Sequence, residues 1–444
     1  MSILTIEHRS PAELKPFARN ARTHSAKQIS QIAASINTFG FNNPVLVDKN
    51  NVVIAGHGRV EAARQLGLDT VPVIRLEHLS DAEKRAYILA DNRLAEKAGW
   101  DRDILAIELQ GLLEQDLDFD VAITGFEMPE IDVLIGELEP KSEKRDPADF
   151  VPDVQEAAIT RLGDIWQIGP HRLICGDATC PETYARLLDG ERAQMVFTDP
   201  PYNVPIEGHV SGLGAVKHRE FAFASGEMSE AEFTAFLHSV FINLAAASID
   251  GSIHFVAMDW RHMREVLAAG REAYTELKNL CVWSKTNGGM GSLYRSQHEL
   301  FFVFKSGTAA HINNVELGKH GRYRTNVWTY AGANAFSKTR DDDLAMHPTV
   351  KPVALAMDAI LDCSKRKGVI LDAFAGSGTT MVAAHRTGRR GYAIELDPLY
   401  CDVIIRRMKK LSNLDAVHVP SGQTFTAITD ERSGSSKCTE EVAL

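Results

Sequence analysis

Apolar and polar positions alternate with two different periods along the chain, and this predicts its elements. Short apolar runs typical of strands lie at 171–175, 194–198, 252–258, 280–283, 300–304, 369–373 and 392–396. Apolar residues recur at helical spacing at 230–246, 353–365, 379–386 and 400–411. Strands that alternate with amphipathic helices predict an α/β fold with a mostly parallel, doubly wound sheet. Ligands of such sheets bind beyond the carboxyl ends of the strands.

Changes in this pattern divide the chain into parts. We expect a smaller α+β domain at 5–136, an acidic, proline-containing linker at 137–159, the α/β domain at 160–415, and a loose tail rich in Ser, Thr and Glu at 420–444. Two helices have a clear start, because Ser80 with Glu83 and Ser229 with Glu232 have capping-box spacing.

Composition excludes several classes of protein. Of 444 residues, 44% are hydrophobic and 24% charged, which is enough apolar surface to exclude wholesale disorder. With 48 Lys+Arg against 59 Asp+Glu the net charge is −11, so any nucleic acid must be bound by a local basic cleft. The six cysteines form no C-x-x-C pair, and no signal peptide or membrane-length apolar run is present. We therefore expect a cytoplasmic protein with reduced thiols and no membrane partner.

A glycine turn follows the apolar run that ends at Asp372. Gly376 and Gly378 allow the backbone to approach a nucleoside closely, and a helix beginning near Thr379 offers unpaired amides. Glu395 ends the next strand and is placed to accept hydrogen bonds from ribose hydroxyls. Met381 and Val382 follow the turn, so the third glycine of a dinucleotide fingerprint is missing, which disfavours a pyrophosphate ligand.

The sequence Asp-Pro-Pro-Tyr at 199–202 follows another apolar strand. Its two prolines fix the backbone at the strand end and leave the Pro200 carbonyl without a local partner. The carbonyl and the Asp199 carboxylate are two convergent acceptors for one amino group, and Tyr202 offers a flat face for stacking. The candidate catalytic residues are therefore Asp199, Pro200, Pro201 and Tyr202.

These motifs resemble the amino-methyltransferases of DNA, the N6-adenine and N4-cytosine family. Asp-Pro-Pro-Tyr precedes Phe-Ala-Gly-Ser-Gly at 374–378, which is the motif order of the circularly permuted β class. Two further segments, His-Pro-Thr-Val-Lys-Pro at 347–352 and Gly-Asp-Ala at 176–178, resemble segments that lie at that family's cofactor. The resemblance covers roughly 162–411 and implies a Rossmann-like methyltransferase sheet, S-adenosylmethionine as methyl donor, and a target base flipped out of the duplex.

The resemblance also implies which residues contact the cofactor. They are Asp177, Ala178, His347, Lys351, Asp372, Phe374, Ala375, Gly376, Ser377, Gly378, Thr379 and Glu395. We expect no metal site, because the 16 histidines are dispersed without ligand spacing.

Two basic segments could contact DNA. Lys217 and Arg219 lie in a Gly- and His-rich stretch after the Asp-Pro-Pro-Tyr motif, and Arg322 and Arg324 lie among aromatic residues. The second pair falls within 305–346, where the family has its target-recognition segment. A solvated basic loop is the alternative for both stretches.

The N-terminal part resembles the ParB/sulfiredoxin-like domain over most of 10–100. Gly56, His57, Gly58 and Arg59 match its Gly-x-x-Arg turn, which makes an anion site where a helix begins. Partition proteins usually have two adjacent arginines in this turn, whereas Gly58 stands at the first of these positions here. A nucleotide or DNA phosphate at this turn and a purely structural turn both remain open.

Together these observations predict a site-specific, S-adenosylmethionine-dependent methyltransferase for the N6 amine of adenine in double-stranded DNA, as in restriction-modification. Asp in the first motif position favours adenine over the N4 amine of cytosine. The alternatives are cytosine methylation, methylation of RNA or of a protein amide, a non-catalytic ParB-like adaptor, and a dinucleotide-dependent oxidoreductase. Whether the protein forms a homodimer is left open.

Overall fold

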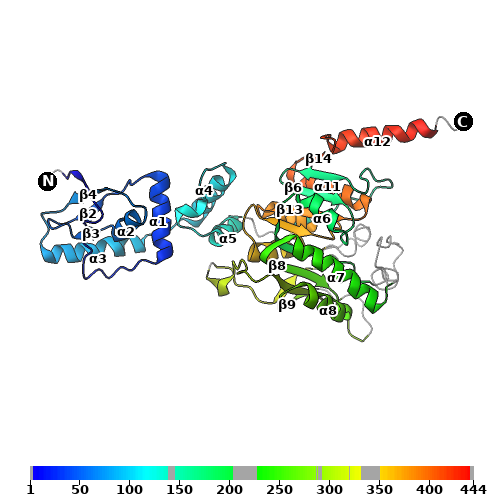
Figure 1. The fold of residues 1–444 in the computed structure, drawn as a ribbon, viewed down its shortest axis with the longest axis horizontal. Coiled ribbons are helices and arrows are strands. Elements are labelled where there is room, and N and C mark those ends of the chain that lie inside the picture. Colours follow the sequence, from blue (N-terminus) through cyan, green and yellow to red (C-terminus); the bar gives the residue numbers. More distant parts are fainter. Residues whose placement is uncertain are drawn as a thin grey trace. The chain divides into compact units, whose positions relative to one another are not determined.

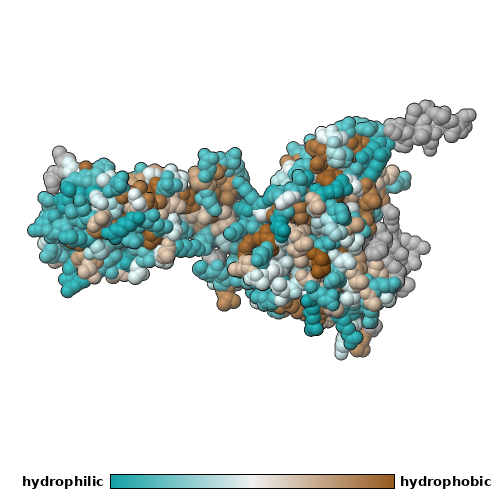
Figure 2. Space-filling model, in the orientation of Figure 1, coloured by the Kyte–Doolittle hydropathy of each residue, from teal (hydrophilic) through white to brown (hydrophobic). Residues whose placement is uncertain are grey.

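The computed structural model describes residues 4–138, 146–203, 228–286, 288, 293–319, 321–331 and 351–440, with side chains as far as 432. The chain forms two compact units, Met1–Pro140 and Lys141–Leu444. Each apolar cluster lies within one unit. Figure 2 shows polar residues over most of the visible surface, with apolar side chains in small groups.

The N-terminal unit contains a small mixed sheet with helices (Figure 1). Its strand order is β1-β4-β2-β3, with bounds Ile6–Arg9, Val71–Arg75, Val45–Val47 and Val53–Ala55. The helices are α1 (Ala26–Phe39), α2 (His57–Gln65) and α3 (Asp81–Lys97). Buried valines of β2, β3 and β4 pack against Val60 of α2. The capping box at Ser80 is present, and α3 begins directly after it.

A second helical cluster follows within the same unit. It consists of α4 (Arg102–Glu114), the 3-10 turn η1 (Val121–Thr124) and α5 (Met128–Leu138), around a separate core that includes Leu109 and Ile131. We expected a single α+β domain as far as 136, so this separate core was not foreseen.

The second unit is built on a ten-stranded sheet with the order β11-β9-β10-β8-β7-β12-β13-β6-β5-β14. In that order the strands are Val327–Tyr330, Glu276–Lys285, His298–Ser306, Ser248–Met258, Ala193–Thr198, Val369–Asp372, Arg390–Glu395, His171–Cys175, Ile165–Ile168 and Ala416–His418. The central strands from β8 to β6 are parallel, as predicted. Toward both edges the sheet also contains antiparallel pairs. There β10 is antiparallel to both β8 and β9, and β5 is antiparallel to β6 and β14.

Helices cover both faces of this sheet because alternate strand residues point to opposite sides. Val196 packs with α6 (Pro181–Leu188), α7 (Glu230–Ala246) and α8 (Met263–Ala273). Its neighbours Met195 and Phe197 pack with the second layer, which is α9 (Val353–Cys363), α10 (Thr379–Arg386) and α11 (Pro398–Ser412). Figure 1 shows α7 and α8, in green, along one face. The predicted doubly wound α/β fold is confirmed.

The centre of the sheet contains its topological switch point. β7 and β12 are parallel neighbours, and the next strand along the chain lies on opposite sides of this pair, β8 beside β7 and β13 beside β12. A crevice for ligands opens at the carboxyl ends of two strands that are related in this way. The sheet therefore brings the segments after Thr198 and after Asp372 to one edge.

Both ends of this unit are more ordered than we expected. The tail was predicted to be loose, but α12 (Phe425–Glu440) is helical and its Ile428 is only 3% exposed. Arg432 of α12 donates to Asp164 at 2.6 Å. In the predicted linker, the backbone amide of Ile159 donates to Asp402 at 2.7 Å. These contacts depend on partners far along the chain, which local composition does not reveal.

Candidate active site

A hydroxyl and a carboxylate join the two central strands where they end. The hydroxyl of Thr198, the last residue of β7, donates to Asp372, the last residue of β12, at 2.9 Å. The same hydroxyl accepts from the backbone amide of Ala373 at 3.2 Å. The other oxygen of Asp372 accepts from Thr380 at 2.6 Å. Asp372, predicted to contact a cofactor, is thus 3% exposed and anchors the turn itself.

Asp199 follows Thr198 and has two unlike oxygens. Oδ2 accepts a hydrogen bond from the ammonium group of Lys351 at 2.5 Å. Oδ1 is buried and, within the part of the chain that the structure describes, has no hydrogen-bond partner. Burial raises the pKa of Asp199, although Lys351 opposes the shift. A buried acceptor without a partner is costly, and a ligand that donates a hydrogen bond to it removes that cost.

Tyr202 is held by its hydroxyl. It donates to Glu299 Oε2 at 3.1 Å and accepts from Lys351 at 3.2 Å. The Lys351 ammonium also lies 5.5 Å from the centre of the Tyr202 ring. Burial and the carboxylates of Asp199 and Glu299 raise the pKa of Tyr202, so the hydroxyl stays protonated.

Glu299 was missed by the sequence analysis. It lies near the start of β10, next to the apolar run 300–304, and its side chain is 17% exposed. Lys285 donates to its Oε1 at 2.5 Å, and Lys351 lies 3.1 Å from its Oε2. Burial would raise its pKa, but these two cations lower it to about 2. The sequence did contain one indication of its role, because a charged residue stands directly before the apolar run of a predicted strand.

The glycine turn lies beside open space. Gly376 and Gly378 have φ values of 52° and 84°, a backbone conformation that glycine adopts without strain. A Cβ at Gly376 would meet no atom within 4 Å. Behind the turn, the buried guanidinium group of Arg407 donates to the Ser377 carbonyl at 2.9 Å and to the Thr379 hydroxyl at 3.3 Å. The sequence analysis did not single out Arg407.

Glu395 joins the turn to β6. Its Oε2 accepts from the Gly376 amide at 2.7 Å, and its carbonyl accepts from the Gly176 amide at 2.9 Å. Burial raises the pKa of Glu395 to about 7. Beyond Gly176, Asp177 is exposed and accepts from Thr179, whereas Ala178 is buried.

The motifs predicted to form one site therefore meet. Lys351 links them, because its ammonium group contacts Asp199 and its carbonyl accepts from the Thr379 hydroxyl at 3.5 Å. We expected Lys351 at the cofactor, but its ammonium group lies at the Asp-Pro-Pro-Tyr corner. Phe374 is half-buried against Phe236, with ring centres 6.0 Å apart, and Ala375 is buried. His347 lies outside the described residues.

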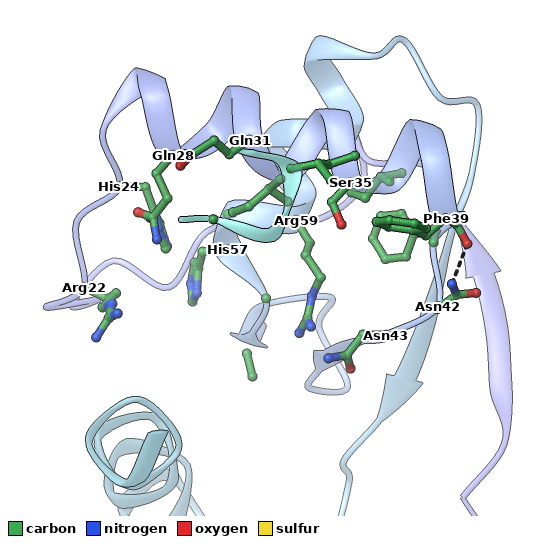
Figure 3. A pocket seen from close by; sticks show the side chains of 18 of the residues that line it. Arg22, His24, Gln28, Gln31, Ser35, Phe39, Asn42, Asn43, His57 and Arg59 are labelled. Carbon is green, nitrogen blue, oxygen red and sulfur yellow. Dashed lines mark hydrogen bonds between the residues drawn. The ribbon is translucent and has the colours of Figure 1, made fainter. Parts of the chain in front are cut away.

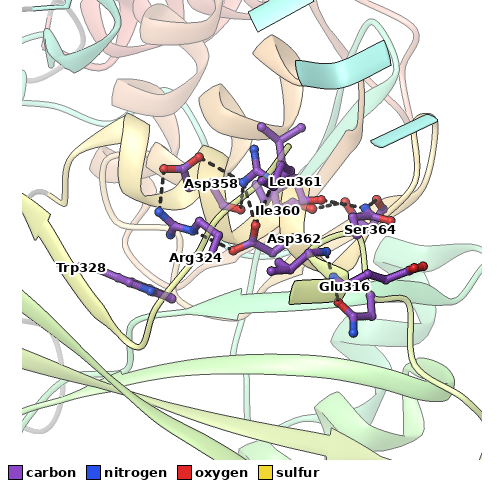
Figure 4. Close-up of polar contacts among 12 residues, drawn as sticks. Glu316, Arg324, Trp328, Asp358, Ile360, Leu361, Asp362 and Ser364 are labelled. Atoms are coloured by element: carbon purple, nitrogen blue, oxygen red, sulfur yellow. Dashed lines mark hydrogen bonds and ion pairs between the residues drawn. The ribbon is translucent and has the colours of Figure 1, made fainter. Parts of the chain in front are cut away.

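Two of the predicted DNA contacts are engaged elsewhere. Arg322 donates to Asp362 at 2.7 Å, and Arg324 donates to Asp362 and Asp358 at 3.1 Å each. Figure 4 shows Arg324 between these two aspartates of α9, near Trp328. Both guanidinium groups are mostly buried by these partners. Contact of the two arginines with DNA stays a prediction. Lys217 and Arg219 lie outside the described residues.

A pocket in the N-terminal unit surrounds the Gly-x-x-Arg turn. It has a volume of about 680 Å³ and is lined by the turn and by α1. Arg22, His57 and Arg59 carry their nitrogen atoms toward the same side of α1 in Figure 3. Gly56 has a φ of 98° and precedes α2. A Cβ at Gly58 would lie 3.0 Å from the end of the Ile32 side chain on α1, so an arginine at this position would require Ile32 to shift.

Comparison with known proteins identifies both units. The family model for DNA methylases matches residues 193–406, the ParB N-terminal domain matches 4–93, and the ParB-methyltransferase HTH domain matches 103–162. The chain belongs to the DNA methylase family, with ParB-type domains ahead of the catalytic unit. The HTH match begins in α4, in the helical cluster that the sequence analysis did not separate from the first domain.

Two related proteins, YnaK and M2.DpnII, agree with this assignment. The methylase is 52% identical over 82 residues to the ParB-like nuclease domain-containing protein YnaK of Escherichia coli, which covers 18% of this chain and 94% of the relative. It is 29% identical over 239 residues to the type II methyltransferase M2.DpnII of Streptococcus pneumoniae, which covers 49% of this chain and 83% of the relative. Among solved structures, the M1.HpyAVI-SAM complex is 18% identical with a TM-score of 0.39 and covers 53% of this chain and 98% of that chain.

The predicted identity is confirmed by these findings. The protein is a DNA methyltransferase of the N6/N4 family, the class for which S-adenosylmethionine was predicted as methyl donor, and it carries a ParB-like domain. Within the described ranges no group of three or more His, Cys, Asp or Glu side chains could hold a metal ion. No helix among the described residues is long and apolar enough to cross a membrane.

Proposed function

We propose that the methylase transfers a methyl group to the N6 amine of adenine in double-stranded DNA, at the Asp-Pro-Pro-Tyr corner. The observation that supports this proposal is the unpartnered Oδ1 of Asp199, buried at the carboxyl edge of β7. An amino hydrogen of the base donates to this oxygen, and the second amino hydrogen donates to the Pro200 carbonyl. Asp as the first residue of the corner favours adenine over cytosine.

The corner acts on the geometry of the amine. The lone pair of an exocyclic amine is delocalised into the ring, so the amine is a poor nucleophile. Two acceptors that hold its hydrogens draw the nitrogen toward tetrahedral geometry and free the lone pair for attack. As the N–C bond forms, the bond between the methyl carbon and the donor's sulfur breaks, and its electron pair stays on sulfur. One amino proton leaves, and the Asp199 carboxylate, whose pKa is raised by burial, holds it before release to water.

The base must leave the duplex to reach this corner. Its amine is enclosed within the base stack, so we propose that the target adenine is flipped out. The Tyr202 ring, fixed by hydrogen bonds from and to its hydroxyl, then provides a face for stacking. Stacking of this kind recovers about 1–3 kcal/mol per base.

The residues around the glycine turn fit the methyl donor. The open space beside Gly376 accommodates a nucleoside, and Glu395 accepts hydrogen bonds from its ribose. Asp177 is exposed just beyond the neighbouring strand end, where we propose that it contacts the adenine ring of the methyl donor. S-adenosylmethionine, when bound, supplies an electrophilic methyl on a sulfonium.

Sequencing of modified bases tests this proposal. DNA from cells that express the wild-type protein should carry N6-methyladenine at a defined sequence, and DNA from cells that express D199N should not. N4-methylcytosine would identify the second target that the family model allows. Methyl groups in RNA or protein, with none in DNA, would contradict the proposal.

We also infer that the N-terminal pocket binds the phosphates of a nucleotide. Arg59 supports this second function, because its Nε is buried and has no hydrogen-bond partner among the residues that the structure describes. Burial lowers the pKa of Arg59, so an anionic ligand would stabilise the guanidinium charge. Labelled CTP and ATP should bind the full chain, and R59A should abolish binding. R93A, an exposed arginine outside the pocket, is the matched control.

The cytoplasm is the compartment that this function requires, since the DNA substrate and the methyl donor are both found there. The described cysteines support this inference because all five are free thiols.

A further inference from the structure

A row of alternating charges crosses the sheet edge at the active site. It runs from Lys285 on β9 through Glu299 on β10 to Lys351, and ends at Asp199 after β7. Each neighbouring pair lies within 3.1 Å, and the row holds two ammonium groups and two carboxylates. Its net charge is therefore zero, which lets it remain in a largely buried place.

Within this row Glu299 has the central position. It accepts from Lys285 through Oε1, while Oε2 faces both Lys351 and the Tyr202 hydroxyl. It thus contacts two residues that themselves touch the proposed target site, and it does not touch Asp199 directly. Its place opposite Trp283 in the β9–β10 ladder fixes the backbone from which it reaches these partners.

We propose that Glu299 is a positioning residue for methyl transfer, which holds the Tyr202 ring and shares the Lys351 ammonium group so that Asp199 remains a strong acceptor. This inference rests on the proposed function of the Asp-Pro-Pro-Tyr corner. It adds Glu299, which lies on a different strand from the corner and orients Tyr202 and Asp199 within it.

Two consequences follow from the geometry. Without the Glu299 charge, Lys351 has Asp199 as its only carboxylate partner in the row, so the paired oxygen binds it more tightly. The Tyr202 hydroxyl also loses its charged acceptor, which frees the ring to turn. Both changes impair binding of the base by Asp199 and Tyr202. Neither change alters the glycine turn.

The charges around Asp199 give this role a signature in pH. The groups that face it are Lys351, Tyr202 and Glu299, with Asp372 beyond Thr198. The Glu299 charge raises the pKa of Asp199. Its removal therefore lowers that pKa, and the loss of activity on acidification, which follows protonation of Asp199, moves to lower pH. A purely structural defect would leave that pH unchanged.

The test compares E299Q, E299D and the control E276Q in the full chain. Glu276 lies on β9, is about half exposed, and pairs with Lys278 outside the row. Initial rates of transfer of labelled methyl to unmethylated genomic DNA are measured from acid to neutral pH, with kcat and the KM for S-adenosylmethionine resolved. Direct cofactor binding shows that each variant is folded.

E299Q should lower kcat by about 10- to 100-fold, in line with the loss of a hydrogen bond to a charged group, with little change in the KM for the cofactor. The pH at which the activity of E299Q falls on acidification, the acidic limb of its pH–rate profile, should move to lower values. E299D, which keeps the charge, should keep the wild-type limb, and E276Q should match the wild type throughout.

Two results would overturn the inference while the proposed function stands. One is a wild-type kcat and acidic limb in E299Q, and the other is a lower kcat with an unmoved limb. Failure of the wild-type protein to methylate DNA would instead overturn the proposed function, and this inference with it.

Discussion

The Asp199 carboxylate shows how much depends on single atoms. One oxygen is paired with Lys351, and the other is buried without a partner in the described part of the chain. The paired oxygen keeps the group oriented, while the free oxygen is available to a donor. In Asp372, by contrast, both carboxylate oxygens accept hydrogen bonds from threonine hydroxyls, those of Thr198 and Thr380.

Replacement of Asp199 by Asn tests this division of labour. The amide keeps the shape of the side chain but is a weaker acceptor, so kcat should fall by about 10²–10³-fold or more. Cofactor affinity should be nearly unchanged, because Glu395 and the glycine turn remain intact. Isothermal titration and methyl incorporation measure the two quantities, and a wild-type transfer rate would refute the catalytic role of Asp199.

Glu395 makes the affinity for the cofactor depend on pH. Its pKa is raised to about 7 by burial, and a ribose that donates hydrogen bonds favours the ionised form. Binding therefore releases a proton, and affinity should rise as pH increases through about 7 and level off above it. Binding at pH 6 should be about tenfold weaker than at pH 8.

The variant E395Q is the control for this prediction. It should bind more weakly and lose the pH dependence, since no titrating group remains at that position. A wild-type affinity that is flat between pH 6 and 8 would mean that Glu395 does not receive the ribose.

Elements of the catalytic unit are joined by buried ion pairs as well as by apolar packing. Arg322 and Arg324 hold the segment before β11 against Asp358 and Asp362 of α9, and α9 begins two residues after Lys351 (Figure 4). This network fixes the helix that follows the lysine of the active site.

Removal of one partner from this network should destabilise the fold. D362A leaves two buried guanidinium groups with less compensation, which costs about 3–5 kcal/mol. The exposed pair Glu276–Lys278 is the matched comparison, where E276A should change stability by less than about 1 kcal/mol. Urea unfolding of both variants measures the difference, and equal effects would contradict a structural role for the network.

The sequence predicted elements better than it predicted contacts between them. The helices 230–246 and 379–386 have the predicted bounds, because local capping and periodicity determine them. The motifs at 199–202 and 374–378 were found because strand ends with Pro or Gly are visible locally. The contacts of Glu299 and Arg407, and the pairing of Arg322 with Asp362, join residues far apart in the chain. No local pattern encodes these contacts.

The whole molecule combines two units with separate cores and separate candidate ligand sites. Asp199 belongs to the large sheet, whereas Arg59 belongs to the N-terminal unit and its pocket. Since each unit has its own core, loss of one site should leave the fold of the other intact.

This independence predicts a double dissociation in the full chain. D199N should bind nucleotide like the wild type and transfer methyl at least about 10²-fold more slowly. R59A should lose nucleotide binding and retain the kcat of methyl transfer. Filter binding and methyl incorporation on the same preparations measure both. A loss of kcat in R59A with an unchanged melting temperature would show that the sites are coupled.

The central claim is that the corner at 199–202 methylates the exocyclic amine of adenine in DNA. The most direct measurement is single-molecule sequencing of modified bases in DNA from cells that express either the wild-type chain or D199N. We expect N6-methyladenine at a defined sequence with the wild type and its loss with D199N. Equal N6-methyladenine in both samples, or no modified base with a folded, cofactor-binding wild-type protein, would contradict it.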